Sequence, residues 1–338
     1  MSIDRRRFLQ AGVGTSLAAV LHSCTQSSQP STGDSLSSAE PPIKIRVGFW
    51  PITAGLPLYF GVNQGLFKAA GLEVEAVKFA SAQQVAEAGI AGRIEGTVAL
   101  ATGALGLAEI ASPGLFKIIA TNVSNVDMIF DEFIVEKDAP FQSIADLRGK
   151  RVSCSPGPQN VAIAKGILRK NGIEYPQVEP LDIKQHIAAI EAKQVDAIFT
   201  LEPTGTIGRL KGITRVLESG VISKYLLGDP KALWHGGSVS LTSQFLKTHP
   251  QTAKKYIGVV TQAIETVRNQ PDVVRPALEE YTAVKGDLSR EVPLTGFKLY
   301  SEFSETDLKD FQTYFDFIHA EKILSKRIEV APLIYKDA

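Results

Sequence analysis

From residue 43 onward, the chain alternates short runs of β-branched and aromatic residues with longer runs of helical periodicity. The runs IKIRVGFW (43–50) and LEVEAVKF (72–79) are typical of strands, and the segment between them carries apolar residues at helical spacing up to Gly71. Strands that alternate with helices predict an α/β fold. The alternation restarts after DEFIVE (131–136), so the sequence predicts two α/β units in series.

Length and composition agree with this prediction and exclude some functions. A chain of 338 residues exceeds what one compact core usually holds, and its 44% hydrophobic content can support buried cores. The formal net charge of zero argues against a nucleic-acid partner, which needs clustered Lys and Arg. Five scattered His and two Cys argue against a metal site. We therefore expect no nucleic acid, no metal and no cofactor.

The first 23 residues are expected to be an export signal rather than part of the fold. Three arginines (5–7) precede an apolar run from Ala11 to Leu21, whose eleven residues are too few to cross a bilayer. A basic start, a short apolar run and a small residue before the break are the parts of an export signal. RRRFL (5–9) resembles the twin-arginine export pattern, with Asp4 where Ser or Thr is usual. The alternative is an ordinary first helix with a buried cysteine.

The end of this segment resembles a bacterial lipobox. In LHSC (21–24), the thiol of Cys24 would take a lipid and become the new N-terminus, although His22 stands where a small or aliphatic residue is usual. The next stretch, TQSSQPSTGDSLSSAEPP (25–42), has no apolar periodicity and is rich in Ser and Pro, as a flexible tether should be. We expect a tether over 24–43 and a periplasmic body that a lipid anchors to a bacterial membrane.

Four phrases of the body carry a family resemblance. They are VGFWPITAGLPLYFGVNQGLFKAAGLEVE (47–75), DAPFQSIADLRGKRVSCSPGPQNVAIAKGILRKNGI (138–173), IAAIEAKQVDAIFTLEP (187–203) and FLKTHPQTAKKYIGVVTQAI (245–264). In this order they resemble the solute-binding proteins of ABC importers for nitrate, sulfonates, taurine and bicarbonate, which are related to thiamine-precursor binding proteins. The resemblance covers roughly residues 44–330.

The resemblance implies both a fold and a role. The fold is the type II periplasmic-binding-protein fold, in which two lobes, each a mixed sheet flanked by helices, are joined by a two-strand hinge. Lobe one would comprise 44–132 plus 235–330, and lobe two 133–234. The implied role is a monomer that captures a small polar solute between its lobes and delivers it, without catalysis, to ABC permease and ATPase subunits.

The loops after the predicted strands supply the candidate ligand residues, because ligands of open α/β sheets bind beyond the carboxyl ends of the strands. Trp50 offers an aromatic face, and the helix starts near Ser81, Thr102 and Gln159 offer free backbone N–H groups. Trp50 could equally be a core residue, Ser81 only a helix cap, and Glu202 the partner of a salt bridge. Trp234, at the return crossing between the lobes, could reach the cleft or only pack the hinge. The full set is Trp50, Thr53, Ser81, Thr102, Ser155, Gln159, Glu202 and Trp234.

The identity of the solute and of the functional class stays open at this point. The strand-end loops contain Glu202 and Trp50 but no Lys or Arg, which favours a nitrogen-rich or cationic solute such as a guanidine or an amine. The resemblance also allows a sulfonate, taurine or nitrate-type solute. A ligand-sensing lipoprotein would use the same cleft. An enzyme like the related pyrimidine-precursor synthase is a further alternative, but the lone Cys154 stands where that enzyme has a cysteine-rich run.

Overall fold

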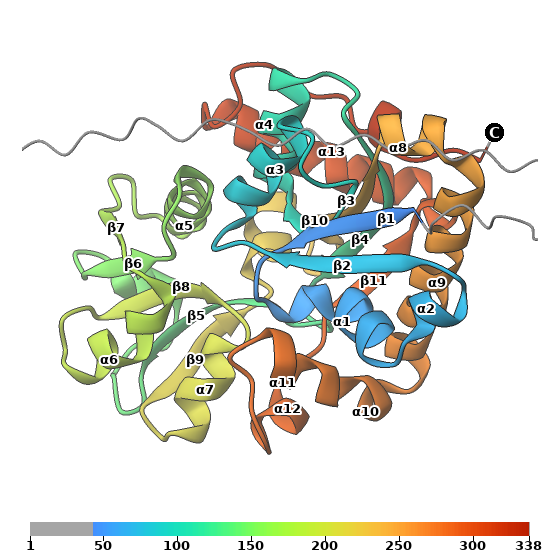
Figure 1. The fold of residues 1–338 in the computed structure, drawn as a ribbon. Coiled ribbons are helices and arrows are strands. Elements are labelled where there is room, and N and C mark those ends of the chain that lie inside the picture. The colour runs from blue at the N-terminus through green and yellow to red at the C-terminus, as the bar shows by residue number, and fades with distance from the viewer. Residues whose placement is uncertain (1–42, 338) are drawn as a thin grey trace, which may run out of the picture. The chain divides into compact units, whose positions relative to one another are not determined.

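The computed structural model describes residues 43–337, which form two mixed β-sheets flanked by helices (Figure 1). This arrangement confirms the predicted α/β class. The predicted export signal, Cys24 and the tether up to residue 42 lie outside the described residues. Within residues 43–337, no helix combines the length and the apolar character that a membrane span requires.

The larger sheet has six strands in the order β11-β4-β10-β3-β1-β2. β10 runs antiparallel between β3 and β4, so the chain returns to the larger sheet after β9. The short strand β11 was not predicted from the sequence. The strands are β1 (Lys44–Phe49), β2 (Glu73–Lys78), β3 (Gly96–Ala101), β4 (Phe116–Ser124), β10 (Trp234–Thr242) and β11 (Gly296–Leu299).

Helices cover both faces of this sheet. One hydrophobic core contains side chains of α3 (Ala82–Ile90), α4 (Thr102–Ala111) and α13 (Glu305–Ala320). The other core contains side chains of α1 (Leu56–Asn63), α2 (Leu66–Ala69), α8 (Ser243–Thr248), α9 (Pro250–Asn269), α10 (Pro271–Val274) and α11 (Leu278–Tyr281), and α12 (Leu288–Glu291) follows them.

Local sequence signals explain most helix boundaries, with one exception. Ser81 caps α3, as predicted, because its hydroxyl accepts a hydrogen bond from the backbone N–H of Gln84 at 3.3 Å. The prediction of a single helix up to Gly71 is wrong. Gly65 has a φ of 65°, a left-handed conformation that interrupts the helix and separates α1 from α2.

The smaller sheet has five strands in the order β7-β6-β8-β5-β9. They are β5 (Asp131–Glu136), β6 (Val152–Cys154), β7 (Val178–Pro180), β8 (Ala197–Leu201) and β9 (Thr214–Ser219). Side chains alternate between its faces. Phe133 and Phe199 share a core with α5 (Pro158–Lys170), whereas Ile134 and Ile198 pack with Ile190 of α6 (His186–Glu191). α7 (Thr204–Leu210) follows β8.

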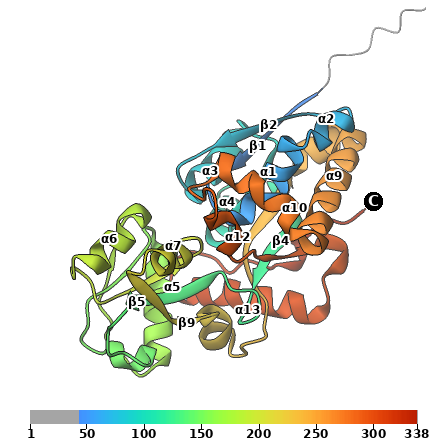
Figure 2. The same ribbon diagram turned by 90° about the horizontal axis from the view of Figure 1, so that it is seen from below.

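The chain crosses between the sheets twice, over residues 125–130 and 220–233, and the two crossings are bonded to each other. The backbone N–H of Val126 donates to the carbonyl of Pro230 at 3.2 Å. α13 packs on β10 and α4 and also on residues 223–227, next to the second crossing (Figure 2). Arg169 of α5 forms an ion pair with Glu321, just beyond α13. The helix therefore contacts elements of both sheets.

Candidate ligand-binding site

A cavity of about 520 Å³ lies between the carboxyl ends of strands from both sheets. Trp50, which follows β1, and Ala101, which ends β3, line it from the larger sheet. Leu201, which ends β8, and Pro156, which follows β6, line it from the smaller sheet. This is the position at which open α/β sheets bind ligands.

Four of the eight predicted ligand residues line this cavity: Trp50, Ser81, Gln159 and Trp234. They come from four separate parts of the chain; the strand-end rule selected Trp50, Ser81 and Gln159, whereas Trp234 was predicted from its place at the return crossing between the lobes. Trp234 is the first residue of β10 rather than part of a loop. Each of these side chains is therefore placed where it could touch a solute.

The other four predicted residues are not part of the cavity wall: Thr53, Thr102, Ser155 and Glu202. The hydroxyl of Thr102 donates to the backbone carbonyl of His235 at 2.6 Å, and its neighbours Gly103 and Ala104 line the cavity instead. Thr53 is buried beside the cavity residue Ile52. The strand-end rule thus located loops that reach the cavity, but it did not determine which side chain of each loop faces it.

Glu202 points to the other side of the smaller sheet. Its neighbour Leu201 lines the cavity, and successive strand side chains face opposite sides. The Glu202 carboxylate accepts hydrogen bonds from the hydroxyl of Thr206 at 2.9 Å and from the backbone N–H of Thr206 at 3.1 Å. Burial raises the pKa of Glu202. The carboxylate is bonded to α7, so the structure does not support the prediction of a cationic solute that rested on it.

A backbone irregularity holds Trp50 in place. Its indole N–H donates to the carbonyl oxygen of Ala99 at 2.8 Å. Ala99 has a φ of 53°, a left-handed conformation that residues other than glycine seldom adopt. The pairing of β10 with β3 shifts register between Ser238 and Ser240, which marks a β-bulge at this point of β3. The bulge turns a carbonyl toward Trp50, whose ring stays partly exposed.

Trp234 is the second tryptophan of the cavity wall and packs against two buried aromatic side chains. Trp234 is 3% exposed, stacks on Phe130 and lies edge-on to Tyr314, with ring centroids 5.8 Å apart. The indole N–H of Trp234 and the phenol of Tyr314 have no hydrogen-bond partner. Burial raises the pKa of Tyr314, while the nearby side chains of Trp234 and Gln159 act in the opposite direction. Tyr314 is therefore a buried neighbour of two cavity residues, Trp234 and Gln159, and is not itself one of the residues that line the cavity.

None of the described residues that line the cavity has a charged side chain. The polar members of the wall are Ser81, Gln83, Asn122, Gln159 and Asn160. The helices α3, α4 and α5 begin at the cavity, and the starts of α4 and α5 have no side-chain cap. Backbone N–H groups at helix starts favour oxygen acceptors. The site is therefore suited to hydrogen bonding and stacking rather than to pairing with a charge.

Comparison with known proteins decides the family. Residues 53–273 match the family described as "NMT1/THI5 like", a match that covers well over half of the chain. The chain belongs to the NMT1/THI5-like family. The family resemblance predicted from the four sequence phrases is thereby confirmed. A comparison with curated proteins returns no match.

Solved structures show the fold that this member of the NMT1/THI5-like family shares with others. The periplasmic aliphatic sulphonate binding protein SsuA from Escherichia coli superposes with a TM-score of 0.70 at 16% identity, over 88% of this chain and 94% of that one. The alkanesulfonate-binding protein SsuA from Xanthomonas axonopodis pv. citri, bound to MOPS, superposes with a TM-score of 0.68 at 20% identity, over 88% of this chain and 99% of that one. The periplasmic nitrate-binding protein NrtA from Synechocystis PCC 6803 superposes with a TM-score of 0.63 at 15% identity, over 86% of this chain and 83% of that one. The predicted periplasmic-binding-protein fold is confirmed.

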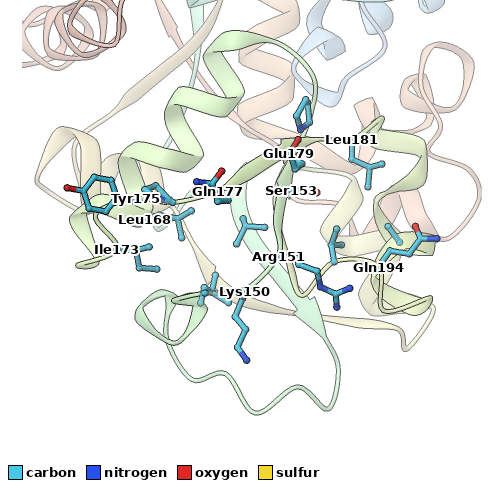
Figure 3. A pocket seen from close by; sticks show the side chains of 17 residues that line it. Lys150, Arg151, Ser153, Leu168, Ile173, Tyr175, Gln177, Glu179, Leu181 and Gln194 are labelled. Carbon is cyan, nitrogen blue, oxygen red and sulfur yellow. The ribbon is translucent and has the colours of Figure 1, made fainter.

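A second cavity, of about 570 Å³, belongs to the smaller sheet alone (Figure 3). Val152 and Val195 place it at the amino ends of β6 and β8, the opposite end of these strands from the first cavity. Arg151 on its wall already pairs with Asp196 at 2.8 Å. None of the eight predicted ligand residues lines it. The cavity between the sheets is therefore the better candidate site for this family member.

The described residues offer little for catalysis. Cys154 is fully buried, and burial raises the pKa of its thiol to about 12, so the reactive thiolate is not formed near neutral pH. His186 is buried, with its ring nitrogens facing the Thr200 hydroxyl and the Leu181 carbonyl. Within residues 43–337, no group of three or more His, Cys, Asp and Glu side chains could hold a metal.

Several cavity residues were not predicted from the sequence. Phe130 precedes β5, and Phe199 lies inside β8, so neither follows the end of a predicted strand. Asn122 lies inside β4, and Ile323 follows α13. A polar residue such as Asn122 within a run of buried strand residues is a signal that could have been noticed, because buried amides need partners.

Proposed function

We propose that this chain is the extracytoplasmic solute-binding component of an ABC importer, which captures a small organic solute between its two sheets and delivers it to a membrane permease. The observation that carries the proposal is the cavity of about 520 Å³ at the carboxyl ends of strands from both sheets. Only two short crossings join the sheets, so a hinge motion could open and close this cavity.

Names of structurally similar proteins support the same role. Their titles describe proteins that bind aliphatic sulphonates, alkanesulfonates and nitrate. We propose that this chain also binds a sulfonate or a related solute with oxygen acceptors, because helix starts and amide side chains at the cavity offer N–H donors. A guanidine- or amine-like solute has less support, because Glu202 does not line the cavity.

The proposal includes a place of action. An export signal over 1–23 and lipidation at Cys24 would put the binding body in the periplasm, tethered beside a permease and its ATPase. A ligand-sensing lipoprotein would have the same cavity and differ in its membrane partner. An enzyme is disfavoured by the buried, protonated thiol of Cys154.

Tryptophan fluorescence tests the proposal directly. The chain contains two tryptophans, and both of them, Trp50 and Trp234, line the cavity. A panel of alkanesulfonates, benzenesulfonate, taurine, nitrate, guanidine and pyrimidines should contain a solute that changes the emission and raises the melting temperature. At 100 times its dissociation constant, a solute adds about 2.7 kcal/mol to the free energy of unfolding.

Two variants with single tryptophans locate the binding site. In Trp50→Phe and in Trp234→Phe, the remaining indole still faces the cavity, so each variant should keep a solute-dependent change in emission. A solute that binds in calorimetry but leaves the emission of the wild type and both variants unchanged would place the site elsewhere. Failure of every solute would contradict the proposed function.

A further inference from the structure

We propose that the cavity between the sheets prefers a neutral amide-type solute, a carboxamide or a sulfonamide, to the anionic acid of the same shape, and that Asn122 hydrogen-bonds this solute. This inference rests on the proposed function and names the chemical class of its solute. Among the oxygen-bearing solutes of that proposal, it favours those that carry an N–H donor next to the oxygen.

Asn122 places a buried amide at the cavity. It lies inside β4, is 3% exposed and lines the cavity. Its backbone is paired on both sides, with Gly237 of β10 and Phe297 of β11. Its side-chain amide makes no hydrogen bond to another residue of 43–337, and it is not among the fully enclosed unpaired groups, which include the Trp234 indole N–H. The amide of Asn122 therefore opens onto the cavity.

Two glycines of β10 keep this amide uncovered. The pairing of β10 with β4 shifts register between His235 and Gly237, so Gly236 is an extra residue of β10 beside Asn122. An added Cβ at Gly236 would lie 3.3 Å from the Asn122 Nδ2, and one at Gly237 would lie 2.7 Å from its Oδ1. Gly236 itself lines the cavity. Because both positions lack a side chain, a solute can approach the amide.

A second amide reaches the cavity from the smaller sheet. Gln159 of α5 lines the cavity, and its Oε1 lies against Gly103 of α4, where an added Cβ would be 1.9 Å away. Two other amides of the wall, those of Gln83 and Asn160, already donate to neighbouring residues. A solute in the cavity can therefore be held by one amide from each sheet, Asn122 and Gln159.

An amide side chain pairs fully only with a partner that both donates and accepts. Its oxygen accepts hydrogen bonds, and its NH₂ group donates them. A carboxamide or a sulfonamide offers an N–H donor beside an oxygen acceptor, so it satisfies both ends. A carboxylate or a sulfonate only accepts, so it leaves the Asn122 oxygen unpaired and faces it with a negative charge.

The rest of the wall does not compensate an anion with a charge. None of the described residues that line the cavity has a cationic side chain. A buried anion without a cationic partner carries a large desolvation cost. The helix starts of α4 and α5 donate to the oxygen of either kind of solute, so they do not distinguish the two. The amide of Asn122 does distinguish them.

Matched pairs of solutes test this preference. Benzenesulfonamide and benzenesulfonate, benzamide and benzoate, and methanesulfonamide and methanesulfonate differ chiefly by an amino group in place of a charged oxygen. Isothermal titration calorimetry at neutral pH gives the dissociation constant of each solute. In the wild type, at least one amide should bind about tenfold more tightly than its paired acid, because the acid makes one hydrogen bond fewer.

Two variants of Asn122 show whether this residue carries the preference. Asn122→Leu replaces the amide with an apolar group of similar size, and Asn122→Ala removes the amide without filling the cavity. Both should stay folded, because they remove a buried amide that has no protein partner. Each should weaken the amide solute by about tenfold and abolish its preference over the acid.

Val123→Ala is the matched control. Val123 is the buried neighbour of Asn122 in β4, faces the other side of the sheet and does not line the cavity. Its truncation weakens the packing of the same strand without removing a polar group. Val123→Ala should therefore keep the wild-type preference for the amide.

Four results would overturn the inference. One is equal or tighter binding of the acid in every pair, which would leave the solute-binding role intact. Another is an unchanged preference in both Asn122 variants. A third is the same loss of preference in Val123→Ala, which would reveal a general effect on β4. The fourth is binding of no probe, and the solute panel of the proposed function then decides separately whether the cavity binds any solute.

Discussion

Ala99 combines a left-handed backbone, with a φ of 53°, and a buried methyl group at the β3 bulge. A left-handed conformation costs an L-residue about 1–2 kcal/mol, and glycine avoids that cost. Ala99→Gly also loses a buried methyl, worth about 0.8 kcal/mol, and gains freedom in the unfolded chain, worth about 0.5–1 kcal/mol. Because these effects oppose one another, the free energy of unfolding of Ala99→Gly should lie within about 1 kcal/mol of the wild-type value. Urea denaturation measures this difference.

Ala120→Gly is the control for this prediction. Ala120 is buried in β4, pairs with Val239 and Leu299, and has no left-handed backbone. The substitution loses the same methyl without relief of strain, so it should destabilise by about 1–2 kcal/mol more than Ala99→Gly. Equal losses in the two variants would contradict the interpretation that the bulge stores strain to hold Trp50.

Asp131, the first residue of β5, has a buried carboxylate that is hydrogen-bonded to the end of β4 and to the second crossing. It accepts a hydrogen bond from the backbone N–H of Ile222 at 2.8 Å and one from the Ser124 hydroxyl at 3.5 Å. Burial raises its pKa from 3.8 to about 6, against the opposing effect of these hydrogen bonds. The strand that follows the first crossing therefore begins with a group that resists ionisation.

This raised pKa predicts how stability depends on pH. Between pH 3.8 and pH 6, folded Asp131 keeps its proton while the unfolded chain loses it, so its contribution to stability is full below pH 3.8 and is lost as pH rises through 6. The loss amounts to about 3 kcal/mol, at about 1.4 kcal/mol per pH unit. Asp131→Asn removes this loss. Relative to the wild type, the variant should therefore gain stability as pH rises from 4.5 to 8 in urea denaturation.

Asp127→Asn is the matched control. Asp127 lies in the crossing four residues before Asp131, but it is exposed and pairs with Lys231 on the surface. Its substitution should leave the pH dependence of stability unchanged, because an exposed pair contributes little. If Asp131→Asn and the wild type showed parallel stability curves from pH 4.5 to pH 8, Asp131 would not be the group that resists ionisation.

Elements with strong local signals could be predicted from the sequence. The bounds of β5 agree with the run DEFIVE (131–136) in the sequence, and the start of α13 carries a local signal, a capping box between Ser304 and Asp307. β11 could not be predicted, because four residues hold too little pattern and its pairing with β4 depends on distant packing. Likewise, Gly65 ends α1 through its conformation, which the apolar periodicity does not show.

The candidate site could be predicted only in part, for a related reason. The strand-end rule found Trp50 and Gln159 because loop position alone brings them to the cavity. It misplaced Glu202 because the side that a residue faces depends on strand register. The bulge that fixes Trp50 and the unpaired hydroxyl of Tyr314 depend on contacts between segments far apart in sequence. No local pattern encodes such contacts.

Among residues 43–337, those that line the cavity all lie between Trp50 and Ile323. The first strand of the larger sheet begins at Lys44. Binding should therefore not depend on the predicted signal and tether. We expect a chain that begins at Pro42 to bind its solute with a dissociation constant within about twofold of the full chain, a difference below 0.5 kcal/mol.

A comparison of the full chain with the variant Cys24→Ser tests whether the N-terminal segment anchors the protein to a membrane. In a bacterial host, the wild type should partition into the detergent phase of a Triton X-114 extract, and Cys24→Ser into the aqueous phase, because only a lipidated N-terminus carries acyl chains. Both should bind the same solute equally well in the fluorescence assay. Loss of binding in the folded, shortened chain would show that residues before 42 complete the site. Aqueous partitioning of the wild type would instead contradict lipidation at Cys24 and identify His22 as an obstacle to processing.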